Sequence, residues 1–311
     1  MVNQRIQSDL LTEADCLKRL QIRPRAPGRI LTYSTPLQGW TDSSFGSLIG
    51  LDDHGFHRGD GVFEALRMVN RKLYLLNPHL ERMKLSAQRI GIELPPEFAS
   101  LPLILEAGLK NWTEPHAMVR LFLTRGPGGF STNPRECLGS QLYALIMPFQ
   151  PLAEEKFTHG VRIGRSQIQV KEGWMAITKS LNYLPNVMMK KEALDRGLDF
   201  TVSFDDSGAL AESSTENIVV LTREGKLAHP RLSKILRGCT MSRLFDLVES
   251  AGLLPVHREV RLTEEDLKSA RGLMMVGTTL DVLPVCQYEG HAIPISPFAA
   301  PLLELIRQDQ G

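Results

Sequence analysis

A polar connector, QPLAEEKFTHG at Gln150–Gly160, divides the sequence near its middle. Strand-like segments rich in β-branched and aromatic residues lie on both sides of it, together with segments of helical periodicity. Because 311 residues are many for one compact core, the connector is expected to separate two domains. We place an N-terminal arm at residues 1–29, a small α/β domain at residues 30–149 and a larger α/β domain at residues 161–311.

The order of the predicted elements indicates a mixed α/β fold of the α+β type, without the alternating βαβ rhythm of a parallel sheet. Two β-rich runs, Val62–Val69 and Leu73–Leu76, flank Asn70-Arg71-Lys72, and this arrangement predicts a hairpin. A helix is expected over Leu184–Arg196, closed by Gly197. The sequence has no G-x-G-x-x-G motif, so a dinucleotide-binding fold is not indicated.

Charge and composition argue against several classes of protein. The net charge is +1, which gives no electrostatic reason to expect binding to nucleic acid or a membrane surface. The 4 cysteines are widely spaced and match neither a metal site nor a disulfide framework. The first residues lack the apolar segment of a signal peptide, and no apolar run approaches the ~20 residues that span a bilayer. We therefore expect a cytoplasmic protein.

Lys179 lies within the apolar stretch AITKSLNYL. Apolar surroundings disfavour the ammonium form of lysine, so the pKa falls and the free amine that forms Schiff bases becomes available. The alternative is a structural lysine that extends its ammonium group to water or pairs with a carboxylate. The stretch alone leaves both interpretations open.

Glu212 follows in ALAESSTENIVVL, 33 residues after Lys179. A carboxylate on such a strand can reach a protonated ring nitrogen, the contact that lets pyridoxal phosphate act as an electron sink. A solvated turn glutamate is the alternative, and Glu216 is a local competitor for the same contact.

Two segments further along can bind phosphate. Free N–H groups at the start of a helix bind anions, and a helical pattern starts after a glycine in ILRGCTMSRL. A second hydroxyl-bearing turn occurs in VGTTLDVLPV. A plain helix start and a simple β-turn are the alternatives. The residues concerned are Gly238, Cys239, Thr240, Gly277, Thr278 and Thr279.

Arginines in the first half can also hold anions. Arg82 lies on the side of its helix that is expected to be buried, where it can contact a phosphate or pair with a structural acid. Arg67 and Arg120 lie in strand-like segments and can bind a substrate carboxylate through two hydrogen bonds, or can face solvent.

Together these stretches resemble the class IV aminotransferase family, the fold-type IV enzymes that use pyridoxal 5'-phosphate. The resemblance runs from about His54 to Pro294 and rests on the ordered set HRGDGVFEALR, HLERM, TKSLNYLPNVMMKKEA, AESSTENIVVL, ILRGCTMSRL and VGTTLDVLPV. It implies a two-domain fold, a homodimer, and a ping-pong exchange of an amino group between an amino acid and a 2-oxo acid.

The resemblance also implies roles for individual residues. Lys179 is expected to be the catalytic Schiff-base lysine, and Glu212 the partner of the pyridine nitrogen. Tyr183 is expected near the phenolic oxygen of the cofactor. The expected phosphate ligands are Arg82, Gly238, Cys239, Thr240 and Thr278, and the expected substrate-binding residues are Phe63, Arg67, Arg120 and Thr279. Cys239 departs from the isoleucine or valine that is usual in relatives.

The substrate is less well defined than the chemistry. FEALR at Phe63–Arg67 resembles the corresponding stretch of branched-chain aminotransferases, and Arg120 matches an arginine of those enzymes, which slightly favours a branched-chain or similar L-amino acid. A 4-amino-4-deoxychorismate lyase, which forms p-aminobenzoate and pyruvate, and a D-amino-acid aminotransferase are the alternatives. Phe130 stands where the lyases are expected to have a substrate-binding arginine. A non-catalytic protein that binds pyridoxal phosphate is a further alternative.

Overall fold

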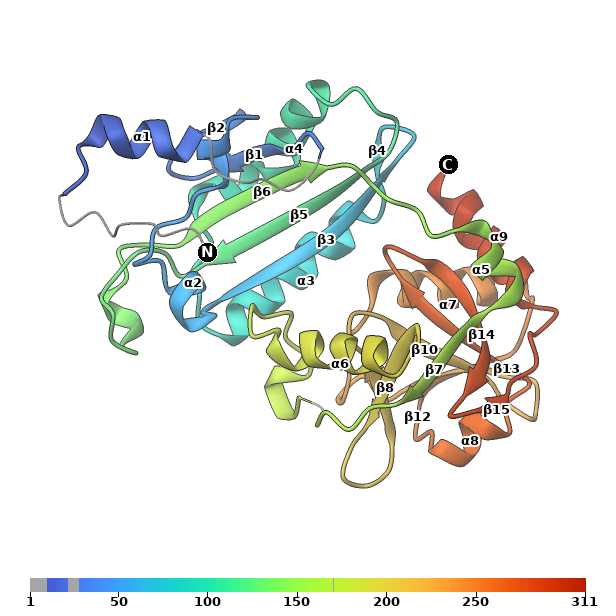
Figure 1. Cartoon of the computed structure of the whole chain (residues 1–311). Helices are drawn as coiled ribbons and strands as arrows, with labels where there is room; N and C mark the ends of the chain where they lie inside the picture. The colour runs from blue at the N-terminus through green and yellow to red at the C-terminus, as the bar shows by residue number, and fades with distance from the viewer. Residues whose placement is uncertain (1–9, 22–27, 170) are drawn as a thin grey trace, which may run out of the picture.

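The computed structural model describes residues 10–21, 28–169 and 171–311, and these residues form two sheets with helices packed on them (Figure 1). A short helix, α1 (Glu13–Gln21), precedes the first sheet. Thr12 and Asp15 cap this helix, with 2.6 Å between the Thr12 hydroxyl and the Asp15 carboxylate and 3.2 Å between the Asp15 N–H and the Thr12 hydroxyl. The mixed α/β class expected from the sequence is confirmed.

The first sheet is antiparallel throughout and is built from six strands. Alternate residues of its central strands are fully buried, and they pack with the helices α3 (Leu76–Arg89) and α4 (Leu101–Lys110) in one apolar core. A short helix, α2 (His54–Arg58), lies at the start of β3. The strand order is β2 (Gly39–Thr41), β1 (Leu31–Ser34), β6 (Gln141–Met147), β5 (Ala117–Thr124), β3 (Gly61–Val69) and β4 (Lys72–Leu73).

The second sheet mixes parallel and antiparallel strands and has an apolar core on each face. Its strands are, in order, β12 (Val256–Val260), β11 (Leu227–Pro230), β10 (Asn217–Leu221), β13 (Gly272–Gly277), β14 (Asp281–Tyr288), β7 (Val161–Arg165), β8 (Phe200–Phe204) and β9 (Leu210–Ser213), with β15 (His291–Ala292) beside β14. Its helices are α5 (Glu154–His159), α6 (Leu184–Asp195), α7 (Cys239–Ala251), α8 (Glu264–Lys268) and α9 (Ala299–Gln310). Helix α5 therefore lies within the predicted connector.

The predicted hairpin forms, but its second strand is shorter than expected. Asn70 and Arg71 have positive φ angles of 48° and 65°, as a two-residue hairpin turn requires. Strand β4 then ends at Leu73, because Leu75 also takes a positive φ angle and α3 begins at Leu76. The prediction of a strand over Leu73–Leu76 is therefore wrong in its length.

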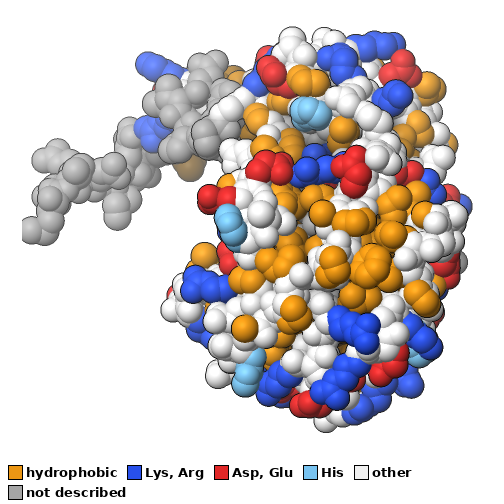
Figure 2. Space-filling model, turned by 90° about the vertical axis from the view of Figure 1, so that its right-hand side faces the viewer, with side chains coloured by type: hydrophobic (Ala, Val, Ile, Leu, Met, Phe, Trp, Pro, Cys, Tyr) orange, Lys and Arg blue, Asp and Glu red, His pale blue; other side chains and the backbone are white. Residues whose placement is uncertain are grey.

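The end of α9 joins the two sheets. On the face shown in Figure 2, acidic and basic side chains lie side by side above a central area of hydrophobic side chains. The Asp309 carboxylate accepts hydrogen bonds from the Tyr74 hydroxyl at 2.7 Å and from Arg243 Nε at 2.9 Å. The Gln310 amide donates to Asp281 at 2.6 Å. None of the helices in the described part of the chain is long and apolar enough to cross a membrane.

A short antiparallel pairing joins β3 to the segment that carries Lys179. The Phe63 N–H donates to the Lys179 carbonyl at 3.0 Å, and the Leu181 N–H donates to the Gly61 carbonyl at 2.9 Å. Gly61 is required by this close approach, because a Cβ atom there would lie 2.7 Å from the Leu123 carbonyl oxygen and 2.6 Å from a Leu181 methyl group. The position of Lys179 is thus fixed by the first sheet, although its sequence belongs to the second half.

We expect Gly61→Ala to lower the free energy of unfolding by about 1–3 kcal/mol, because the added methyl group must displace either Leu123 or the Lys179 segment. Urea unfolding at pH 7 measures this. Gly39→Ala is the matched control, since a Cβ atom there meets only an oxygen at 3.7 Å. Equal unfolding midpoints for the two variants would contradict the assigned contact.

Candidate active site

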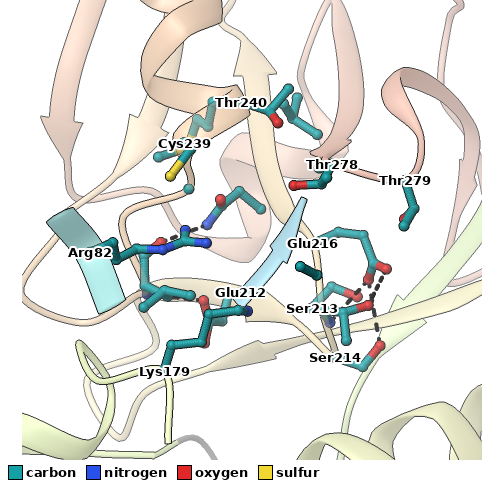
Figure 3. Close-up of a pocket in the computed structure, with 18 of the residues that line it drawn as sticks. Arg82, Lys179, Glu212, Ser213, Ser214, Glu216, Cys239, Thr240, Thr278 and Thr279 are labelled. Carbon is teal, nitrogen blue, oxygen red and sulfur yellow. Dashed lines mark hydrogen bonds between the residues drawn. The ribbon is translucent and has the colours of Figure 1, made fainter. Parts of the chain in front are cut away.

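A cavity of about 320 Å³ lies between the two sheets, and both halves of the chain line it (Figure 3). Lys179 enters from the segment paired with β3, Glu212 from β9 and Arg82 from α3. The start of α7 and the turn after β13 complete the wall. Of the residues predicted from the sequence, Phe63, Arg82, Arg120, Lys179, Tyr183, Glu212, Gly238, Cys239, Thr240, Thr278 and Thr279 line this cavity, whereas Arg67 does not.

Lys179 is buried, with 8% of the residue exposed. Its ammonium nitrogen lies 3.3 Å from the Tyr183 hydroxyl and 4.6 Å from the centre of the Phe63 ring. Burial, and after it the positive charge of Arg82, lower the pKa of Lys179 to about 8. A larger fraction of the side chain is therefore free amine near neutral pH than for an exposed lysine.

Glu212 is a half-buried acid whose carboxylate has one hydrogen bond among the described residues. Its Oε2 atom accepts from the Leu236 N–H at 3.0 Å. Burial raises the pKa of Glu212 to about 7, against the opposing effects of this hydrogen bond and of the nearby Lys171 and Lys179. Glu216, the local competitor, also lines the cavity, but its carboxylate accepts hydrogen bonds from the adjacent Thr215 N–H and hydroxyl.

Arg82 pairs with a structural acid, which is one of the two roles that the sequence left open. Its guanidinium donates to the two oxygens of Glu64 at 2.8 and 2.7 Å, and it also reaches the cavity. His79 contacts the same carboxylate at 2.7 Å. Burial alone would raise the pKa of Glu64, but Arg82 and His79 outweigh it and lower the pKa to about 2. Glu64, which is fully buried, is thus a structural counter-ion that the sequence analysis did not identify.

The start of α7, here called the anion cup, has the geometry that can bind an anion. Gly238 is the N-cap residue of this 13-residue helix. Because glycine has no side-chain oxygen, the first N–H groups of the helix have no capping hydrogen bond and face the cavity. A Cβ atom at Gly238 would lie 1.9 Å from the Asn217 side-chain oxygen, which explains why glycine is needed here. The Thr240 and Thr278 side chains lie on the same side of the cavity as Cys239 (Figure 3).

Arg67 is the one predicted site residue that lies elsewhere. It is four residues beyond Phe63 on β3, about 13 Å along the strand. Its guanidinium donates to both oxygens of Asp281 at 2.9 and 2.8 Å and stacks over the Phe149 ring at 4.3 Å. The expected substrate-binding role of Arg67 is therefore corrected: the residue joins the two sheets.

Arg120, in contrast, has an uncommitted guanidinium. It lies on β5 directly across from Ala65, and both residues line the cavity. In the part of the chain that the structure describes, the Arg120 guanidinium forms neither an ion pair nor a hydrogen bond. An arginine in this state can bind a carboxylate of a ligand.

Lys171 and the turn Ser213–Thr215 also line the cavity, and sequence analysis missed them. Lys171 lies in the irregular segment between β7 and the 3-10 turn Gly173–Met175, where no periodicity marks a residue as facing inward. The one sequence signal for this turn was the pair of serines directly after Glu212. Small hydroxyl side chains are such a signal because they allow a ligand to approach the backbone.

A buried amine, a half-buried acid and an anion cup surround one cavity, which is the donor set that a phosphorylated pyridine aldehyde requires. The amine can bond to the aldehyde carbon, the acid can bind the ring nitrogen, and the helix start can bind the phosphate. The chemistry of these residues therefore fits pyridoxal 5'-phosphate.

Comparison with known proteins gives a consistent result. A profile of the family described as "Amino-transferase class IV" matches residues 61–288. The D-amino-acid transaminase, chloroplastic, of Arabidopsis thaliana is 31% identical over 311 residues, covering 96% of this chain and 82% of that protein. A putative branched-chain-amino-acid aminotransferase of Methanocaldococcus jannaschii is 30% identical over 246 residues, covering 79% of this chain and 84% of that protein.

The fold also matches solved structures. The branched-chain aminotransferase of the archaeon Thermoproteus uzoniensis, solved with norvaline, superimposes with a TM-score of 0.82 at 23% identity, covering 90% of this chain and 94% of that one. At this identity the likeness concerns the fold. The family resemblance and the mixed α/β, fold-type IV class expected from the sequence are confirmed.

We expect Glu64→Gln to lower the free energy of unfolding at pH 7 by about 3 kcal/mol, because it leaves the Arg82 charge buried without its counter-ion. The pKa of Glu64 is lowered in the folded protein, so its contribution is complete above its ordinary pKa of 4.5 and is lost as the pH falls toward about 2. Urea unfolding at several pH values measures both effects.

Glu81→Gln is the matched control, because Glu81 is an exposed residue of the same helix. The difference between wild type and Glu64→Gln should stay constant from pH 7 to about pH 5 and shrink below pH 4.5. A stability loss no larger than that of Glu81→Gln would contradict the role of Glu64 as counter-ion.

Proposed function

Because this chain belongs to the class IV aminotransferase family, we propose that it is a pyridoxal-phosphate-dependent aminotransferase that exchanges an amino group between an amino acid and a 2-oxo acid in a ping-pong cycle. The observation that carries the proposal is the meeting of Lys179, Glu212 and the start of α7 in one cavity. A non-catalytic binding protein would have no need to keep a buried lysine amine next to that anion cup.

Bound pyridoxal phosphate supplies an electron-withdrawing ring that stabilises negative charge at the α-carbon of the substrate. In the proposed cycle Lys179 would hold the cofactor at its aldehyde carbon until the amino group of the substrate displaces it. The freed Lys179 amine would then take the proton from the α-carbon of the substrate and return it to the cofactor carbon that keeps the amino group. With a pKa of about 8, about a tenth of Lys179 is free amine at pH 7. The lowered pKa therefore makes the free amine available, and this one form acts both as the nucleophile and as the base.

The other cavity residues bind and orient. Glu212 is assigned to the pyridine nitrogen, and Tyr183 to the phenolic oxygen, since its hydroxyl is 3.3 Å from the Lys179 amine. The Phe63 ring packs edge-on against Tyr183 at 4.8 Å and limits the access of water to Lys179. The phosphate ligands proposed are Arg82, the backbone after Gly238 at Cys239 and Thr240, and the Thr278 hydroxyl.

For the donor we propose an amino acid with an apolar side chain, with a branched-chain L-amino acid first. Phe63, which stacks with Phe122 at 6.2 Å, provides an apolar wall. Thr279 and Arg120 are left to bind substrate carboxylates. A D-amino acid is the second candidate, because the Arabidopsis thaliana relative and several bacterial relatives are named for D-amino acids. The lyase alternative is weaker, since Phe130 stands where the lyases are expected to have a substrate-binding arginine.

A homodimer is part of the proposal. Large apolar side chains are exposed around α2, the loop after β5, the 3-10 turn Gly173–Met175 and the start of α6. The Asn182 amide, which precedes α6, donates to the Gly59 carbonyl at the end of α2 at 3.2 Å. A surface of this kind is typical of a protein interface. The cytoplasmic location stays a prediction, and the name of the plant relative places that protein in the chloroplast. The exposed apolar side chains are Phe56, Phe130, Trp174, Leu184, Val187 and Met188.

The proposed function is tested with purified protein, pyridoxal phosphate and matched pairs of L- and D-amino acids, with 2-oxoglutarate or pyruvate as acceptor. We expect turnover with one enantiomer of an apolar amino acid. Lys179→Ala should lower kcat by at least about 10²–10⁴-fold, because it removes the group that transfers the proton. Wild-type protein that binds pyridoxal phosphate but aminates no 2-oxo acid, or a Lys179→Ala variant with wild-type rates, would contradict the proposal.

Arg120→Leu is expected to raise KM for 2-oxoglutarate by about tenfold or more, because it removes a charged partner of the second carboxylate. KM for pyruvate, which has no second carboxylate, should change little. Steady-state kinetics with the two acceptors measures the difference. Equal losses for both acceptors would contradict the assignment and would place Arg120 at the carboxylate next to the reacting carbon.

A further inference from the structure

Lys171 is a half-buried cation for which the proposed chemistry has no task. Its ammonium nitrogen lies 4.6 Å from the centre of the Tyr183 ring, and its side chain lines the cavity together with Glu212. No ion pair or hydrogen bond of its ammonium group is found within residues 10–21, 28–169 and 171–311. A cation in this state is costly to bury unless an anion lies nearby.

Glu212 is the anion that lies nearby. Lys171 and Glu212 together line the main cavity and also a small second cavity between β8, β9 and α6. Lys171 thus approaches the carboxylate from the side of α6, away from the anion cup. The only hydrogen bond of the Glu212 carboxylate within the described residues is the one from the Leu236 N–H. The Lys171 ammonium and the Glu212 carboxylate are near neighbours. Within the described residues, neither group forms an ion pair with another residue.

The remaining charges around Glu212 are already committed. Lys179, from the segment paired with β3, is assigned to the cofactor. Arg82, from α3, is paired with Glu64. Lys234 lines the small cavity but pairs with Asp205 at 3.6 Å. Glu216 and Cys239 also line the main cavity, and the Glu216 carboxylate accepts hydrogen bonds from Thr215. Burial raises the pKa of Tyr183, at the start of α6, well above its usual range, which keeps it neutral.

The pKa values of Lys171 and Glu212 also indicate that the two side chains influence each other. Burial raises the pKa of Glu212, and Lys171 is the largest of the charges that oppose this effect, ahead of Lys179 and Arg82. Conversely, burial lowers the pKa of Lys171, and Glu212 opposes that change. Each of the two groups therefore favours the charged form of the other.

Resting on the proposed function, we propose that Lys171 is a positioning residue whose ammonium group keeps Glu212 ionised, so that the proton shared by Glu212 and the ring nitrogen of bound pyridoxal phosphate stays on the nitrogen. The proton forms an N–H bond in place of an O–H bond, and no other atom changes partner. A ring protonated on nitrogen withdraws electrons more strongly, so Lys171 acts on the reaction through Glu212 and without touching the substrate.

Pyridoxal phosphate labelled with ¹⁵N in the ring tests this directly, because the chemical shift of the ring nitrogen reports whether it carries a proton. The protein is reconstituted with the labelled cofactor at pH 7 as wild type, Lys171→Met, Lys171→Arg and Lys234→Met. Lys234→Met is the matched control, since it removes a second lysine from the same small cavity. The dissociation constant of pyridoxal phosphate is measured for each protein by titration.

We expect the wild type, Lys171→Arg and Lys234→Met to show a protonated ring nitrogen. Lys171→Met should move the shift toward the neutral pyridine and weaken cofactor binding by about tenfold or more, since loss of a neighbouring opposite charge changes the ionisation of a carboxyl by about one to three powers of ten. Lys171→Met with the wild-type shift, or Lys171→Arg that behaves like Lys171→Met, would overturn the inference. Wild-type protein that binds no pyridoxal phosphate would instead overturn the proposed function itself.

Discussion

The pairing of β3 with the Lys179 segment is the constraint on which the rest of the structure depends. Two backbone hydrogen bonds, from Phe63 to Lys179 and from Leu181 to Gly61, place the lysine at the junction of the two sheets. Strand geometry then fixes which side of the segment faces the cavity. The Phe63 ring, from the same strand, covers the ammonium group. Burial of Lys179, its lowered pKa and its position beside Tyr183 all follow from this short contact between distant parts of the chain.

A second constraint is the distribution of charge around the cavity. Glu64 holds Arg82 and His79 in a buried network, so the guanidinium is fixed in place before any ligand binds. Its charge is thereby partly compensated, yet it still reaches the cavity and lowers the pKa of Lys179. Arg82 thus links the anion cup to the reactivity of the lysine. A rigid, already paired arginine loses little side-chain entropy when it binds a phosphate, which favours a preformed site.

Much of this could be predicted from the sequence, because the relevant signals are local. Lys179 in apolar surroundings, Glu212 on a short strand and the glycine before α7 each have a direct structural counterpart in the cavity wall. The failures involve partners that are distant in the sequence. Arg67 is separated by 214 positions from Asp281, the acid that pairs with it. Lys171 lies in an irregular segment, where neither strand nor helix periodicity indicates which way a side chain points.

The central claim is that Lys179 is the residue that binds the cofactor covalently. Treatment of the wild-type protein and pyridoxal phosphate with sodium borohydride, followed by peptide mass mapping, tests it most directly, because reduction makes the bond permanent. The account predicts one phosphopyridoxyl group, on the peptide that carries Lys179, and none on the peptide that carries Lys171. A label on Lys171 or on surface lysines, with Lys179 unmodified, would contradict it.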